Sequence, residues 1–69
     1  MNPIVGSQNV RAAGYNTTTS TLTVEFKNGR RYEYYNVPVG LYHELTDGRP
    51  HPWTRTNHRI RRHRYSPIR

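Results

Sequence analysis

TLTVEFKNGRRYEYY, residues 21–35, is the stretch that decides the fold. The segment 21–26 alternates polar and apolar side chains, so its Leu, Val and Phe share one face. Such alternation is typical of a strand with one buried face. Residues 27–29, Lys-Asn-Gly, then predict a turn, and residues 30–35 predict a second strand that returns beside the first.

The register of this hairpin depends on which turn keeps one face apolar. A two-residue Asn-Gly turn would set Phe26 against Arg31 and so bring a charge to the apolar face. A three-residue loop with Gly29 in the left-handed backbone region keeps the charged side chain of Arg31 off the apolar face. The pairs are then Phe26 with Arg30, Val24 with Tyr32, and Leu22 with Tyr34. We therefore expect both of these tyrosines in the core, and Glu33 and Tyr35 on the outer face.

Weaker patterns flank the hairpin. Residues 10–15 predict a further strand, and residues 1–8 a loose lead-in. Because proline suits the first helical turn, residues 38–46 predict a short helix, which Asp47 and Gly48 end.

The last third of the chain predicts a loop and a second helix. Residues 49–52 are expected to form a rigid loop, with Trp53 packing back on the core. Asn57 can cap a helix over residues 58–65. The predicted fold class is therefore α+β, a small three-stranded antiparallel meander followed by one or two short helices. We expect one domain over residues 1–69, with its core at 5–46 and a basic C-terminal segment at 47–69.

Charge is distributed unevenly along the 69 residues. The formal net charge is +7, and residues 47–69 contribute +6 of it, with seven arginines and one acidic residue. This distribution is typical of a module that binds phosphate groups. Arginine can grip a phosphate with its planar fork and can stack on a base. A nucleic acid is therefore the expected partner, although a solvated tail or a docking surface for an acidic protein gives the same pattern.

A longer pattern resembles a known family. Its elements are Val5-x-Ser7, Gly14-Tyr15, Leu22-x-Val24-x-Phe26-x-x-Gly29, Tyr32-x-Tyr34, Val37-Pro38, Tyr42 and Leu45. The pattern is similar to that of the KTSC domain, found at the C-terminus of some lysyl-tRNA synthetases and as small free-standing bacterial and phage proteins. Asn57-x-x-Ile60-Arg61 and Tyr65 continue the likeness, but residues 47–52 replace the family's Ala-x-Ser-x-Gly segment. The resemblance implies an RNA-binding role and no catalytic activity.

The expected interface combines arginines with aromatic side chains. Clustered arginines on the second helix would repel one another, and a polyanion would relieve that repulsion and release counterions. Tyr35, Tyr15 and Trp53 are candidates for stacking on bases, because the apolar hairpin face does not use them. The predicted nucleic-acid-binding residues are Arg55, Arg59, Arg61, Arg62, Arg64, Tyr35 and Trp53.

Other functions find less support. The chain has no cysteine, and its four histidines lack zinc-site spacing, so we expect no metal and no cofactor. Catalytic motifs are absent, which predicts that the protein is not an enzyme. No apolar run approaches the roughly 18 residues of a membrane span, so we expect a cytoplasmic location and no membrane partner.

The alternative function is a non-catalytic protein-interaction module. A small phage protein of this type could dock on a host enzyme or a virion component through its basic and aromatic surface, with Trp53 and Tyr42 as buried anchors. The sequence leaves the oligomeric state open.

Overall fold

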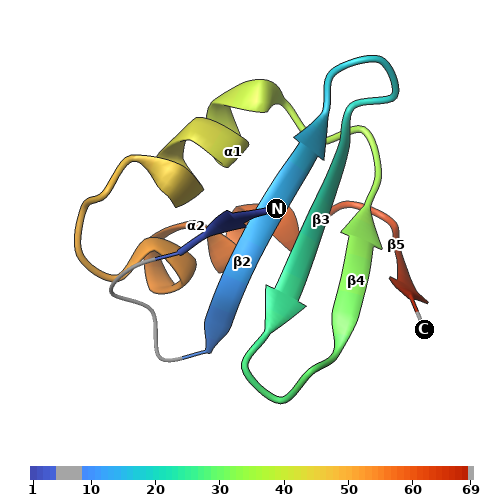
Figure 1. The fold of residues 1–69 in the computed structure, drawn as a ribbon. Helices are drawn as coiled ribbons and strands as arrows, with labels where there is room; N and C mark the ends of the chain where they lie inside the picture. Colours follow the sequence, from blue (N-terminus) through green and yellow to red (C-terminus); the bar gives the residue numbers. More distant parts are fainter. Residues whose placement is uncertain (5–8, 69) are drawn as a thin grey trace.

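The computed structural model describes residues 1–4 and 9–68, which form a five-stranded antiparallel sheet and two helices (Figure 1). The strands are β1 (Asn2–Pro3), β2 (Val10–Asn16), β3 (Thr21–Phe26), β4 (Arg31–Tyr34) and β5 (Tyr65–Ile68). The helices are α1 (Val39–Thr46) and α2 (Pro52–Ile60). The predicted α+β class is confirmed, whereas the predicted number of three strands is wrong.

The first strand corrects the expected loose lead-in. Asn2 pairs with Ala13 and Pro3 pairs with Ala12, so β1 covers part of the free edge of β2. Within the family pattern noted above, Val5 and Ser7 lie outside the described residues.

The β3–β4 hairpin has the predicted register. The pairs are Leu22 with Tyr34 and Val24 with Tyr32. The N–H of Phe26 donates to the carbonyl oxygen of Arg30 at 2.8 Å, which closes the three-residue loop. Gly29 has a φ angle of 90°, in the left-handed region that glycine enters without a Cβ clash. The turn therefore fixes which side chains of β4 face the core.

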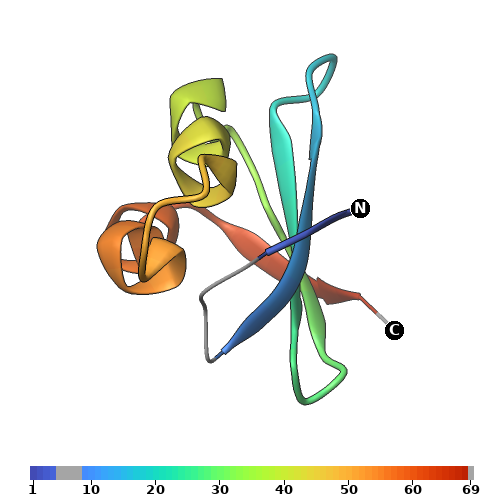
Figure 2. The ribbon, with the colours of Figure 1, turned by 60° about the vertical axis from the view of Figure 1, so that its left-hand side comes forward.

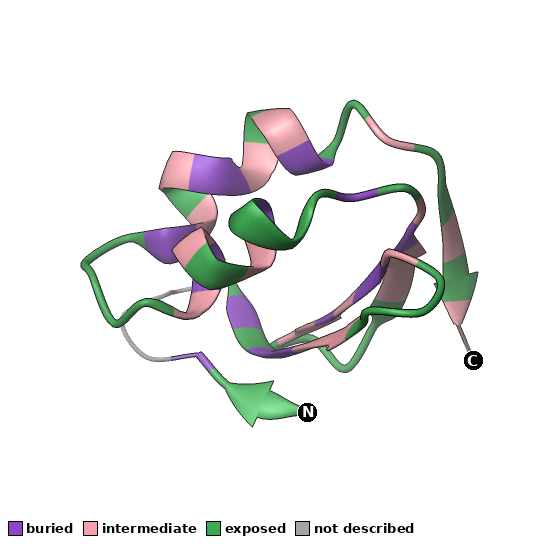
Figure 3. Ribbon diagram, turned by 90° about the horizontal axis from the view of Figure 1, so that it is seen from above, coloured by how far each residue is buried: buried purple, intermediate pink, exposed green. Residues whose placement is uncertain are grey.

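The sheet and the helices form two layers. The strand order is β1-β2-β3-β4-β5, and both helices lie on the same face of the sheet (Figure 2). Figure 3 marks the buried positions on the helices and the strands. The buried cluster between the layers consists of Ile4, Val10, Ala13, Leu22, Val24, Tyr34, Val37, Leu41, Leu45 and Ile60.

Helix α1 lies close to its predicted position. Pro38 is its N-cap, with an extended ψ of 140°, and so is not the first helical residue as expected. Asp47 is the C-cap, and Gly48 follows with a φ of 82°, which confirms the predicted end. Leu41 and Leu45 are one turn apart and both are buried, so they fix the face that α1 presents to the sheet.

Helix α2 corrects the predicted second helix over residues 58–65. It begins at Pro52, because proline lacks an N–H and its fixed φ suits the first helical position. Thr56 and Ile60 are buried one turn apart, and the Thr56 hydroxyl donates to the Pro52 carbonyl at 2.7 Å. Asn57 therefore lies inside the helix and does not cap it. Trp53 belongs to its first turn.

Residues 61–64 form a turn where the second helix was expected to continue, and β5 begins at Tyr65, the last residue of that predicted helix. Tyr65 pairs with Tyr34, and Pro67 pairs with Tyr32. The N–H of Tyr35 donates to the Arg64 carbonyl at 2.8 Å and continues this pairing. Strand β5 satisfies backbone groups of β4 that would otherwise stay unpaired. As an edge strand, it tolerates the proline.

Two glycine substitutions should have opposite effects on stability. Gly29→Ala should lower the free energy of unfolding by about 1–2 kcal/mol, because alanine is strained in the left-handed region. Gly40 lies in α1 with open space around its Cβ position. Gly40→Ala should therefore raise the free energy of unfolding by about 0.5–1 kcal/mol, through the better helix propensity of alanine. Urea unfolding followed by circular dichroism measures both values, and an unchanged Gly29→Ala variant would contradict the three-residue loop.

Candidate nucleic-acid interface

The first two predicted arginines, Arg55 and Arg59, connect the helices to each other. Arg59 Nη1 and Nη2 donate to Glu44 Oε2 and Oε1 at 2.9 and 2.7 Å, a bidentate pair. Arg55 Nη2 donates to Asp47 Oδ1 at 3.2 Å, and its Nε donates to the Pro50 carbonyl at 3.0 Å. These side chains hold α2 against the end of α1.

The pairing also changes the acid–base properties of the groups involved. The hydrogen bonds from Arg59 lower the pKa of Glu44, and the carboxylate raises the pKa of Arg59. The backbone N–H of Arg49 lowers the pKa of Asp47, with a further contribution from Arg55. Both carboxylates are therefore charged at neutral pH, and they offset the charges of two arginines that were predicted to bind phosphate.

Arg61, Arg62 and Arg64 have different surroundings. All three are exposed, and they lie in the turn of residues 61–64 between α2 and β5. Within residues 1–4 and 9–68, no ion pair involves them. The turn is held at one end by α2, where the His63 N–H donates to the Ile60 carbonyl at 3.1 Å. Its other end is held next to β4, where the Tyr35 N–H donates to the Arg64 carbonyl. The turn thus presents three positive charges from a fixed backbone.

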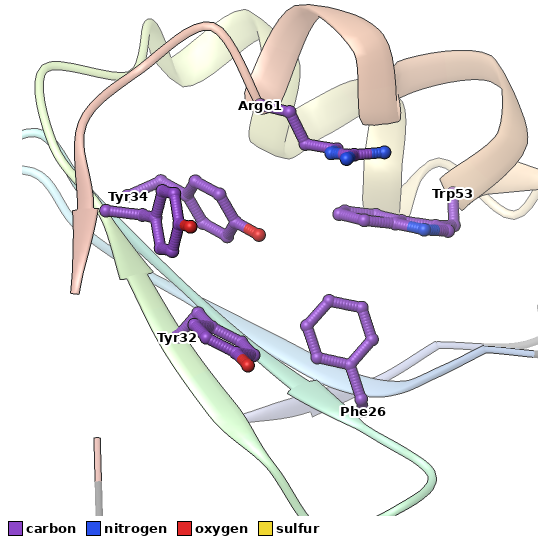
Figure 4. A pocket seen from close by; sticks show the side chains of 6 residues that line it. Phe26, Tyr32, Tyr34, Trp53 and Arg61 are labelled. Carbon is purple, nitrogen blue, oxygen red and sulfur yellow. The ribbon is translucent and has the colours of Figure 1, made fainter. Parts of the chain in front are cut away.

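An aromatic cleft of about 440 Å³ lies between this turn, α2 and the sheet (Figure 4). We call it the aromatic cleft, and its lining residues are Phe26, Tyr32, Tyr34, Trp53, Arg61 and Tyr65. The sheet supplies four of the six residues, because alternate positions of β3 and β4 and the first position of β5 share the inner face. Arg61 reaches the cleft from the end of α2.

The rings of the aromatic cleft support one another edge to face. Phe26 contacts Trp53 with ring centroids 5.2 Å apart and ring planes at 85°. Tyr32 contacts Phe26 at 5.7 Å and Tyr65 at 5.8 Å, again with steep interplanar angles. Aromatic pairs favour such arrangements because the edge of one ring is positive and the face of the next is negative. The contacts hold the walls of the cleft in place without filling it.

The two signature tyrosines only partly follow their predicted core role. Tyr34 is 5% exposed and belongs to the core, as expected. Burial raises the pKa of its phenol, and the nearby charge of Arg61 partly opposes that rise. Tyr32 is only half-buried and lines the aromatic cleft. Its position on the inner face is as predicted, but the helices do not cover it.

A second hollow adjoins the aromatic cleft. We call it the basic hollow; it measures about 600 Å³ and is lined by Tyr35, Arg62, His63, Arg64, Tyr65 and Ser66. Tyr65 lines both sites and is 60% exposed. The structure therefore brings Tyr35 together with Arg62 and Arg64, and Trp53 together with Arg61.

Sequence reasoning missed Tyr65, Phe26 and Tyr32 as candidate site residues. Tyr65 was expected at the end of a helix, although the alternation in residues 65–68 is also compatible with a short strand. The other two were expected to be covered by the helices. Tyr15, the remaining stacking candidate, packs on Tyr42 with ring centroids 5.5 Å apart. Its hydroxyl donates to the Val37 carbonyl at 2.6 Å.

The histidines and acidic residues do not converge on a metal site. Among residues 1–4 and 9–68, no three histidine, aspartate or glutamate side chains gather as such a site would require. His43, His51 and His58 are exposed at separate positions on or beside the two helices. None of the helices in the described residues is long and apolar enough to cross a membrane.

Comparisons with known proteins identify the family. The KTSC domain family matches residues 6–52. A lysine–tRNA ligase from Nostoc sp. is 47% identical over 36 residues, which make up 52% of this chain and 6% of the ligase. The described residues form a small α+β domain with an aromatic cleft beside unpaired arginines. The chain belongs to the KTSC domain family, as the sequence pattern indicated.

The family match covers only part of the candidate site. Phe26, Tyr32 and Tyr34 lie within the matched residues 6–52. Trp53, Arg61 and Tyr65 follow that segment. The sheet wall of the aromatic cleft thus belongs mostly to the matched part of the chain, and the helix wall and its arginine come from the following part.

The Glu44–Arg59 pair should make stability depend on pH. Because the folded protein lowers the pKa of Glu44, its charge stabilises the fold above the ordinary glutamate pKa, and this stabilisation is lost as the pH falls through the folded pKa. Glu44→Gln should lower the melting temperature at neutral pH. The difference from the unaltered protein should shrink towards about pH 3, below the ordinary glutamate pKa of about 4.3. Thermal unfolding followed by circular dichroism measures it.

Glu33→Gln is the matched control for this prediction. Glu33 lies on the outer face of the sheet and forms no ion pair with the residues that the structure describes. Its replacement should not lower the melting temperature at neutral pH by a comparable amount. Equal behaviour of the two variants would show that the pair between the helices does not stabilise the fold.

Proposed function

We propose that this domain binds RNA through the turn at residues 61–64, the adjoining start of β5 and the aromatic cleft. The observation that carries this proposal is the group of exposed arginines, Arg61, Arg62 and Arg64, without acidic partners in the described part of the chain. An arginine already bound to a carboxylate gains little from a phosphate. An arginine without such a partner gains a charge-assisted hydrogen bond and releases counterions from the RNA.

The proposal assigns different roles to the five predicted arginines. Arg55 and Arg59 hold the two helices together through Asp47 and Glu44. The arginines of the turn contact phosphates and supply most of the affinity, with low or modest sequence specificity. The domain has no catalytic role in this proposal, and it acts in the cytoplasm.

The comparison with the lysine–tRNA ligase favours RNA over DNA as the partner. That relative is, by its name, a ligase that acts on tRNA, and 52% of this chain matches part of it. The match covers 6% of the ligase, so it supports an accessory role in contacting RNA and does not extend the ligase activity to this domain.

A second candidate function is docking on an acidic protein. The observation that favours it is the aromatic cleft, because interfaces between proteins often centre on a few aromatic side chains in a concave site. Such binding should depend strongly on Trp53 and only weakly on single arginines. RNA binding should instead weaken in similar steps as each arginine of the turn is removed.

The combined substitution Arg62→Ala and Arg64→Ala should weaken RNA binding. If each side chain binds one phosphate, the slope of log K against log salt concentration should fall by about 1 for each arginine removed. Fluorescence anisotropy with a labelled transfer RNA, at salt concentrations between about 50 and 200 mM, measures the slope. A labelled duplex DNA in the same assay tests the preference for RNA.

The control removes the same charge from the other end of β4. Lys27 in the hairpin loop and Arg30 next to it are exposed and form no ion pair in the part of the chain that the structure describes. Lys27→Ala with Arg30→Ala should leave the salt slope nearly unchanged. Equal losses of affinity from both pairs of substitutions would point to a general effect of net charge. Absence of RNA binding at low salt would contradict the proposed function.

A further inference from the structure

We propose that the aromatic cleft binds one unpaired base of a single-stranded RNA, while the basic hollow binds the neighbouring phosphate. This inference rests on the proposed function and makes it more specific. It names the form of RNA that is recognised and the role of each half of the site. The two halves share Tyr65, which is 60% exposed and lines both the cleft and the hollow.

The walls of the cleft suit a flat ring. Five of the six lining residues are aromatic, and the volume of about 440 Å³ falls within the range of small-ligand sites, roughly 300–1,000 Å³. Phe26 on the sheet contacts Trp53 on α2 edge to face, with ring centroids 5.2 Å apart, and Tyr32 contacts Phe26, so the three rings form one continuous aromatic wall (Figure 4). A base that entered from solvent would stack on the open side of this wall and against the exposed ring of Tyr65, not between Phe26 and Trp53. Stacking on such surfaces is how proteins hold unpaired bases.

The position of Arg61 determines the charge of the ligand. Aromatic clefts can also bind cations, which are attracted to the faces of the rings. Here, however, Arg61 is itself one of the residues that line the cleft (Figure 4), so a cation already borders it. A quaternary ammonium group or a methylated lysine would be repelled by it. A neutral ring attached to a negative phosphate fits both the rings and the arginine.

The basic hollow is the natural place for that phosphate. Arg62 and Arg64 line it and have no acidic partner among the residues described, and Tyr35 forms an aromatic wall. Because Tyr65 lines both sites, a base in the cleft places its own backbone next to the hollow. In a duplex the bases are paired and stacked inside, so only a single strand or a loop can supply such a base.

Trp53 makes the cleft directly observable. It is the only tryptophan in the chain, and it lines the cleft. The first experiment therefore follows its fluorescence during titration with a single-stranded RNA of about ten nucleotides, which is within the usual length of a single-strand site. A duplex RNA of the same sequence is titrated in parallel. Anisotropy of the labelled RNAs reports binding independently of the tryptophan.

Variants at Tyr65 separate stacking from charge. Tyr65→Ala should weaken single-strand binding roughly 5- to 150-fold, the range expected for the loss of one base–aromatic stack. Tyr65→Phe keeps the ring and should restore binding. Neither change removes a charge, so the affinity for the duplex should stay the same. Since Tyr65 is largely exposed, both variants should fold, which circular dichroism checks.

A variant at Arg61 tests the choice between a base and a cation. Arg61→Gln removes the positive charge from the cleft and keeps a shorter, uncharged polar side chain. This substitution should reduce the quenching of Trp53 fluorescence by the single-stranded RNA. Tetramethylammonium serves as the cationic probe and should not quench the unaltered protein.

The inference is supported if the single strand quenches Trp53, the duplex binds without quenching, and Tyr65→Ala affects only the single strand. It is overturned if the single strand binds without quenching Trp53 fluorescence, or if Tyr65→Ala weakens the binding of both RNAs equally. Either result would leave the proposed RNA binding intact. Quenching by tetramethylammonium but not by RNA would also overturn it. Absence of binding by either RNA at low salt would overturn both proposals.

Discussion

The left-handed turn at Gly29 is the constraint on which the rest of the structure depends. A loop of three residues pairs Leu22 with Tyr34 and Val24 with Tyr32. Because neighbouring strand residues point to opposite faces, a register one residue longer or shorter would move every side chain of β4 to the other face. The core would then lose Tyr34, and the aromatic cleft would lose the tyrosines that β4 contributes to it. One glycine with positive φ thus positions both the core and the candidate site.

The core and the aromatic cleft lie on different parts of the same inner face of the sheet. Aliphatic residues of β2 and β3 lie under the helices, and Ile60 at the end of α2 completes that packing. Beyond Ile60 the chain turns away into residues 61–64, so Tyr32 of β4 and Tyr65 of β5 are only partly covered. Tyrosine suits such a boundary because its ring is apolar and its hydroxyl tolerates water. A small domain with a limited core can in this way keep an open aromatic site beside it.

The fold also separates the arginines by role. The body of α2 faces α1, whose last turn and cap carry Glu44 and Asp47, and the arginines of α2 pair with these acids. Among the described residues, the arginines of the turn after α2 form no ion pair with either carboxylate. Its arginines therefore keep their charges available for a partner. A segment with a strongly positive sequence thus contributes both to the stability of the helix pair and to a basic surface.

The sequence by itself determined the features that depend on near neighbours. Alternation in residues 21–26, the three-residue loop and the Asp47-Gly48 stop each involve contacts within a few residues, and these predictions were confirmed. The α+β class and the family followed from the same local patterns. The unequal distribution of charge was also evident from the sequence alone.

Only the tertiary structure decided the features that join distant segments. The β4 strand needed a partner for its free edge, so Tyr65–Ile68 became a strand although the local sequence suggested the end of a helix. Pro52 could start α2 early because Thr56 and Ile60 then reach the core. The partner of Arg59 is 15 residues away in the chain, and no local pattern reveals it. The aromatic cleft assembles from two strands of the hairpin, a helix and the last strand. Its existence follows from how these elements pack, because no single one of them contains it.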